Sequence, residues 1–121
     1  ALMLRNRHIE GGITLVAPDL LVYEVANALS YHPKIKGEDI EEDLTALFMA
    51  DLELVPPSSE LTTSVTLKAR QLGISEYDSS YLVLAETIAT NFVTADKKLY
   101  DKVRDTGRLL LLSDLGHKWT V

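Results

Sequence analysis

Three acidic residues, Glu24, Asp78 and Asp96, occupy sequence positions where a carboxylate could bind a ligand or take part in catalysis. Asp78 falls in the first turn of a predicted helix whose N-cap is Ser75. Asp96 follows the short apolar run 92–95, where a predicted strand ends and a helix begins. In an open parallel sheet, ligands bind where strand ends and helix N-termini meet. Asp96 is therefore placed where chemistry usually takes place.

Glu24 falls in the second turn of an apolar helix that we expect to begin at Pro18 and Asp19. A glutamate between Leu21 and Val25 needs a partner if it is buried. A partly exposed helix residue is the simpler interpretation of a single glutamate in such a helix. Its pairing with Asp78 and Asp96 favours a functional role instead.

The three carboxylates stand on three separate elements, so only the fold can bring them together. Their mutual repulsion is then costly unless a cation lies between them. Carboxylate oxygens suit Mg2+ or Mn2+, which hold phosphates and activate water. Thr94, two residues before Asp96, could orient that water or a carboxylate through its hydroxyl. The histidines lack ligand spacing, which argues against a histidine-based zinc site; they are His8, His32 and His117.

Helix capping is the structural alternative for two of the acids. Ser75 and Asp78 have the spacing of a variant capping box, and Asp96 could cap the helix that begins at Lys97. Capping does not explain why Glu24 also lies in an apolar helix.

Three stretches together resemble one known family. They are A-P-D-L-L-V-Y-E-V-A-N-A-L at 17–29, E-Y-D-S-S-Y-L-V-L-A at 76–85 and V-T-A-D-K-K-L at 93–99. In this order and spacing they resemble the PIN domain, most closely the VapC-type toxins of toxin–antitoxin pairs. The resemblance covers most of the chain between residues 16 and 101.

The resemblance implies a three-layer α/β/α fold with a mainly parallel central sheet, formed by residues 1–121 as a single domain. It implies a metal-dependent endoribonuclease in which Glu24, Asp78 and Asp96 bind Mg2+ or Mn2+. It also implies RNA as substrate, a cognate antitoxin protein as partner, and a homodimer. The family's first strand, which lies mid-sheet and ends in a catalytic aspartate, has no counterpart here. We therefore expect this chain to lack that N-terminal strand.

Composition agrees with one globular α/β domain, because 121 residues with 46% hydrophobic content can bury a core. The chain has no cysteine, which excludes disulfides and thiolate chemistry and is compatible with a reducing cytoplasm. No apolar run approaches the roughly 20 residues that span a bilayer, and no secretory signal pattern is present. We expect a cytoplasmic protein without a membrane partner.

The net charge of −6 argues against RNA binding through a broad positive field. Any contact with RNA must be local, and a bound divalent cation would reverse the potential where a phosphate sits.

Short apolar runs alternate with helical patterns along the chain, which favours a parallel sheet covered on both faces. We predict strands at 13–17, 52–55, 92–95 and 109–112. We predict helices that begin near 19, 38, 59, 76 and 97, the last of them reaching 105.

Two other functions remain open at this point. The chain could be a degenerate PIN-like module that binds RNA or a protein without cleaving. It could also be a phosphoryl-transfer α/β domain, which would need adjacent acids after its first strand.

Overall fold

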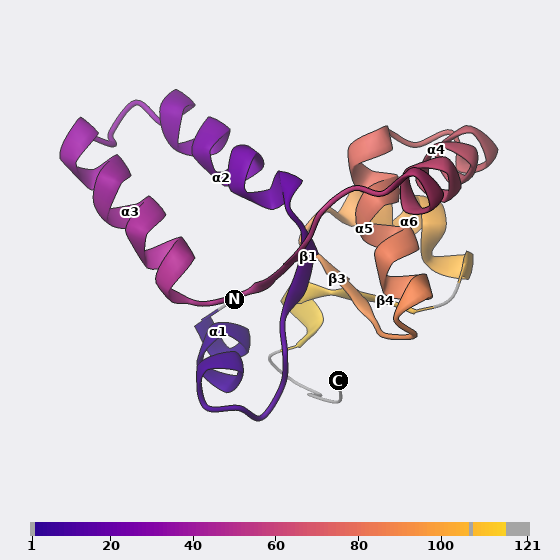
Figure 1. Cartoon of the computed structure of the whole chain (residues 1–121), viewed down its shortest axis with the longest axis horizontal. Coiled ribbons are helices and arrows are strands. Elements are labelled where there is room, and N and C mark those ends of the chain that lie inside the picture. The colour runs from indigo at the N-terminus through magenta and orange to yellow at the C-terminus, as the bar shows by residue number, and fades with distance from the viewer. Residues whose placement is uncertain (1, 107, 116–121) are drawn as a thin grey trace. The chain divides into compact units, whose positions relative to one another are not determined.

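The computed structural model describes residues 2–106 and 108–115, and the chain divides into two compact units, 1–57 and 58–121 (Figure 1). The first unit contains α1 (Leu2–Ile9), β1 (Val16–Pro18), α2 (Leu20–Tyr31), α3 (Gly37–Met49) and β2 (Glu53–Val55). The second contains α4 (Ser59–Leu72), α5 (Glu76–Thr87), β3 (Phe92–Thr94), α6 (Lys97–Val103) and β4 (Leu109–Leu111). Two short 3-10 turns, Arg104–Thr106 and Leu112–Asp114, flank β4.

The strands pair in parallel within each unit, which confirms the predicted mixed α/β class with parallel strands. In the first unit β1 pairs with β2, and Ala17 lies opposite Leu54. In the second unit β3 pairs with β4, and Val93 lies opposite Leu110. Over residues 2–106 and 108–115 the strands form these two separate pairs, and no strand joins one pair to the other.

The first strand begins later than its apolar run suggests. Leu15 donates its backbone N–H to His8 Nδ1 at 3.0 Å, and Ile13 donates its own to the Arg7 carbonyl at 3.4 Å. These donors are therefore not available to a strand ladder, and the predicted strand 13–17 is corrected to Val16–Pro18. Pro18 ends the strand instead of beginning the helix.

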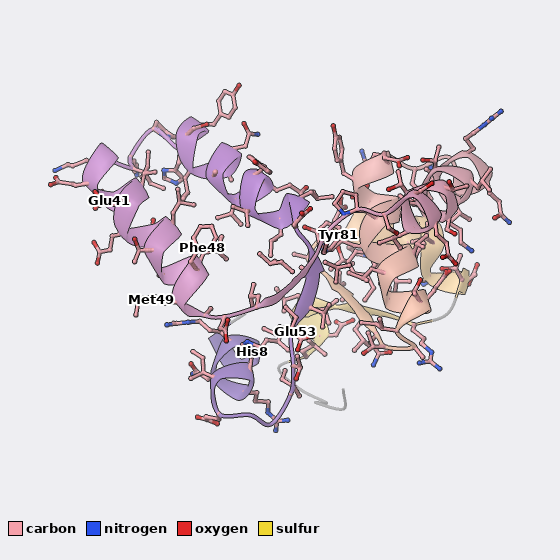
Figure 2. The ribbon with its side chains drawn as sticks, viewed as in Figure 1. His8, Glu41, Phe48, Met49, Glu53 and Tyr81 are labelled. Carbon is pink, nitrogen blue, oxygen red and sulfur yellow. The ribbon has the colours of Figure 1, made fainter. Side chains whose placement is uncertain are left out.

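His8 ties α1 to the segment before β2 (Figure 2). Its Nδ1 accepts from Leu15, so the hydrogen resides on Nε2, which lies 3.1 Å from the carbonyl oxygen of Asp51. This histidine has a structural role, in line with the absence of ligand spacing among the histidines.

The helices α2 and α3 contain no buried residue. Four of their large apolar side chains are 61–80% exposed, namely Tyr23, Tyr31, Phe48 and Met49 (the last two labelled in Figure 2). The apolar face predicted for α2 is thus only partly covered.

The core of the second unit joins α5, α6 and β4 through Leu82, Leu99, Val103 and Leu109. Both ends of α4 carry capping residues. Ser58 Oγ accepts from the Leu61 N–H at 3.1 Å at the start of α4, and Gly73 closes that helix with φ 64°.

Four further boundaries differ by one or two residues from the sequence-based ones. The strand predicted at 52–55 begins at Glu53. The runs at 92–95 and 109–112 end as strands at Thr94 and Leu111, and the helix predicted to reach 105 becomes a 3-10 turn after Val103. Gly107 lies outside the described residues.

Ser79 packs α5 against α4, because its fully buried hydroxyl donates to the Val65 carbonyl at 2.7 Å. We expect Ser79→Ala to lower the free energy of unfolding by about 0.5–1.5 kcal/mol, since the buried hydrogen bond to the Val65 oxygen would be lost while that oxygen keeps its bond within α4. Urea unfolding measures the change. Ser80→Ala is the matched control, because Ser80 is half-buried and its hydroxyl donates to the Tyr77 carbonyl of its own helix. Equal losses in both variants would contradict the role of Ser79.

Candidate active site

Asp78 lies in the first turn of α5, and its carboxylate has no structural task there. Ser75 Oγ accepts from the Asp78 N–H at 3.0 Å and so caps the helix alone. Within the described chain, the half-buried carboxylate of Asp78 makes no hydrogen bond or ion pair with protein. The reciprocal bond of a capping box is therefore missing, and both carboxylate oxygens can bind a ligand.

Asp96 is the N-cap of α6, so the capping interpretation is confirmed for this residue. Its Oδ1 accepts from the Leu99 N–H at 3.1 Å. Its other oxygen, Oδ2, has no protein partner among residues 2–106 and 108–115. Capping and ligand binding are compatible, because each uses a different oxygen.

Thr94 fixes the backbone of Asp96. It is 8% exposed, and its Oγ1 accepts from the Asp96 N–H at 3.1 Å. The hydroxyl thus sets how the chain turns from β3 into α6 and leaves its own hydrogen to donate. The predicted role in orienting a water or a carboxylate stays a prediction.

The second unit brings Asp78 and Asp96 toward one end of the α5–β3 pair. Four residues, 88–91, join α5 to β3, and within them the Thr90 N–H returns to the Ala85 carbonyl at 2.9 Å. The strand consequently runs back along the helix (Figure 1). Tyr81 of α5 stacks on Phe92 of β3, with 5.7 Å between ring centroids and 12° between ring planes.

From that stack, both carboxylates lie in the same direction along the pair. Asp78 is three residues from Tyr81 toward the start of α5, an axial distance of about 4.5 Å. Asp96 is four residues beyond Phe92, about 13 Å along an extended chain. Each also stands one turn before a core residue of the same cluster, Leu82 for Asp78 and Leu99 for Asp96. Both residues therefore lie on the side of the stack toward which β3 runs.

Glu24 lies on α2 in the other unit, and its side chain is exposed. In the part of the chain that the structure describes, no three histidine, aspartate or glutamate side chains form a group that could hold a metal ion. The grouping of Glu24 with Asp78 and Asp96 stays a prediction.

The available donors suit a hard divalent cation. Asp78 offers two carboxylate oxygens and Asp96 offers one, and Mg2+ prefers oxygen ligands from one or two carboxylates together with water. The residues present therefore fit Mg2+ or Mn2+.

Lys102 is a supporting residue that sequence reasoning missed. Its Nζ donates to the Gly73 carbonyl at 2.6 Å and so ties α6 to the turn that precedes α5. The two residues are 29 positions apart, and no local pattern marks the bond.

The charge is unevenly divided along the chain. Residues 1–57 carry four basic and ten acidic residues, whereas residues 58–121 carry eight of each. The entire net charge of −6 therefore belongs to the first unit. The second unit, which contributes Asp78 and Asp96, is neutral overall.

In a comparison with protein families, the model described as PIN domain matches residues 5–105. Among curated proteins the chain has no significant match. Across the described residues, every helix is too short or too polar to cross a membrane.

Proposed function

The chain belongs to the PIN domain family, and on that premise we propose that it is a metal-dependent endoribonuclease that cleaves RNA phosphodiester bonds. A PIN domain generally denotes nuclease activity, often on RNA. The single observation that carries the proposal is the pair of aspartates in the second unit. Asp78 has a carboxylate without a structural partner, and Asp96 keeps one oxygen free after capping α6.

Glu24 is the proposed third ligand. All three acids lie within the matched residues 5–105, which span both units. For the same reason we propose that residues 1–121 form one PIN-like domain.

The chain's own residues hold and orient the ligands. Ser75 and Ser79 fix the first turn of α5, and with it the place of Asp78. Thr94 fixes the turn that presents Asp96. A bound Mg2+ or Mn2+ would supply the positive charge that stabilises the phosphoryl oxygens and lowers the pKa of an attacking water. Histidine is then unnecessary as a base.

The finer biological role is also proposed: the toxin of a toxin–antitoxin pair, acting in the cytoplasm as a homodimer. The resemblance of residues 17–29, 76–85 and 93–99 to VapC-type toxins supports it. A cognate antitoxin would then place an arginine or lysine against the acids.

A degenerate PIN-like module that binds RNA or a protein without cleavage is the second candidate. It is favoured by the lack of any three-residue metal-binding group among residues 2–106 and 108–115.

Metal binding separates the two candidates. We expect Mn2+ at about 100 times its dissociation constant to stabilise the folded chain by about 2.7 kcal/mol, because only the folded state brings the ligands together. Thermal unfolding with Mn2+ and with EDTA measures the difference, and titration calorimetry gives the dissociation constant. Identical unfolding curves, together with no heat of binding, would count against the metal site.

A further inference from the structure

The turn at Gly73, between α4 and α5, is attached to α6 by two kinds of contact. Gly73 ends α4 with φ 64°, and its carbonyl accepts from Lys102 Nζ at 2.6 Å. Carbonyl groups at a helix C-terminus carry partial negative charge, so an ammonium group suits this position. The apolar residues on either side of the glycine, Leu72 and Ile74, pack on the core cluster to which α6 belongs. A polar bond and apolar packing therefore hold this turn against α6.

The position of Asp78 follows from the position of that turn. Ser75 is two residues after Gly73, and its Oγ accepts from the Asp78 N–H at 3.0 Å. The Ser75 carbonyl accepts from the Ser79 N–H, also at 3.0 Å, and Ser79 is fully buried. The chain from the turn to the first proposed ligand is thus short and hydrogen-bonded.

The position of Asp96 follows from the position of α6. The Asp96 carbonyl accepts from the Tyr100 N–H at 3.0 Å, and its Oδ1 accepts from the Leu99 N–H at 3.1 Å, so Asp96 is part of the first turn of this helix. Lys102 stands near the other end of the same helix, about 9 Å from Asp96 along the axis. A bond that fixes the end of so short a helix also fixes the direction of its start.

We propose that Lys102 is a positioning residue for the metal site. Its bond to the Gly73 carbonyl links the helix that begins at Asp96 to the turn that precedes Asp78, and so determines how these two carboxylates lie relative to each other. The inference rests on the proposed function, because it names what holds two of the proposed ligands in place. Mg2+ requires near-ideal octahedral geometry, so small displacements of its ligands lower the affinity.

The charge of Lys102 makes positioning distinguishable from electrostatics. Lys102→Met keeps an unbranched apolar chain and removes a positive charge. Loss of a positive charge from the same unit favours a cation, so electrostatics alone would raise the affinity for Mn2+ or leave it unchanged. Loss of positioning would lower the affinity. The direction of the change therefore separates the two effects.

Titration calorimetry of the full chain measures the Mn2+ dissociation constant. We expect Lys102→Met to bind Mn2+ about 3- to 10-fold more weakly than wild type, the fold-change that corresponds to a moderate coupling between contacting groups. Lys102→Arg keeps a positively charged donor on a long side chain and should bind nearly as wild type. Because Lys102 is exposed, both variants should remain folded, which urea unfolding in EDTA checks independently of the metal.

Lys68→Met is the matched control, because Lys68 of α4 pairs with Glu86 near the other end of α5 at 3.5 Å. It removes the same charge from the same unit and should leave the Mn2+ dissociation constant unchanged. Unchanged or tighter binding by Lys102→Met, or an equal loss of affinity in Lys68→Met, would overturn the positioning role and leave the proposed metal site intact. A wild-type chain that binds no Mn2+ would overturn both.

Discussion

Asp96→Asn is expected to reduce RNA cleavage by about 100-fold or more while the chain stays folded. Asparagine keeps the oxygen that accepts from the Leu99 N–H, and it is about as good an N-cap as aspartate. It removes the charge with which Oδ2 would bind the metal. A catalytic metal contributes several kcal/mol to transition-state stabilisation, and each 1.36 kcal/mol is tenfold in rate. Two quantities are measured for the variant and the wild type: the initial rate of RNA cleavage, and the free energy of unfolding in urea.

Asp96→Ala separates the two tasks of this residue. It loses the cap as well as the charge, so stability should fall by about 0.5–2 kcal/mol in addition to the loss of cleavage. If Asp96→Asn cleaved at the wild-type rate and only Asp96→Ala were impaired, Asp96 would be a cap and nothing more.

Asp78→Asn should also lower cleavage by about 100-fold or more, with a different effect on stability. Ser75 supplies the cap of α5, so without metal the variant should unfold within about 0.5 kcal/mol of wild type. With Mn2+ the wild type should gain stability and the variant should gain far less, because a ligand is lost. Thermal unfolding with and without Mn2+ measures both.

Glu86→Gln is the control on the same helix, since Glu86 lies near the other end of α5 and pairs with Lys68. This variant should cleave normally and keep its response to Mn2+. A comparable loss of cleavage in Glu86→Gln would mean that charge along α5, and not the place of Asp78, sets activity.

Helix ends that carry capping residues are the most predictable from a sequence, because caps act locally. Ser58, Gly73 and Ser75 perform the tasks that their types suggest. The start of β1 was wrong because His8, seven residues upstream, takes the N–H of Leu15. No periodicity of apolar residues can reveal such a bond.

The candidate site was predictable in its residue types and only partly in its geometry. The position of Asp96 at the end of an apolar run correctly indicated a strand end, and the spacing of Ser75 and Asp78 correctly indicated a helix start. That Asp96 caps while Asp78 does not depends on side-chain orientation, which spacing leaves open. The tie from Lys102 to Gly73 and the stack of Tyr81 on Phe92 are contacts between distant segments, visible only in the fold.

Metal-dependent cleavage tests the central claim most directly. The purified full chain is incubated with a labelled RNA that contains single-stranded loops, in Mg2+, in EDTA, and in EDTA followed by excess Mg2+, with Asp96→Asn assayed in parallel. The account predicts cleavage in Mg2+, none in EDTA, recovery when Mg2+ is restored, and almost none by the variant. Cleavage that persists both in EDTA and in Asp96→Asn would contradict it.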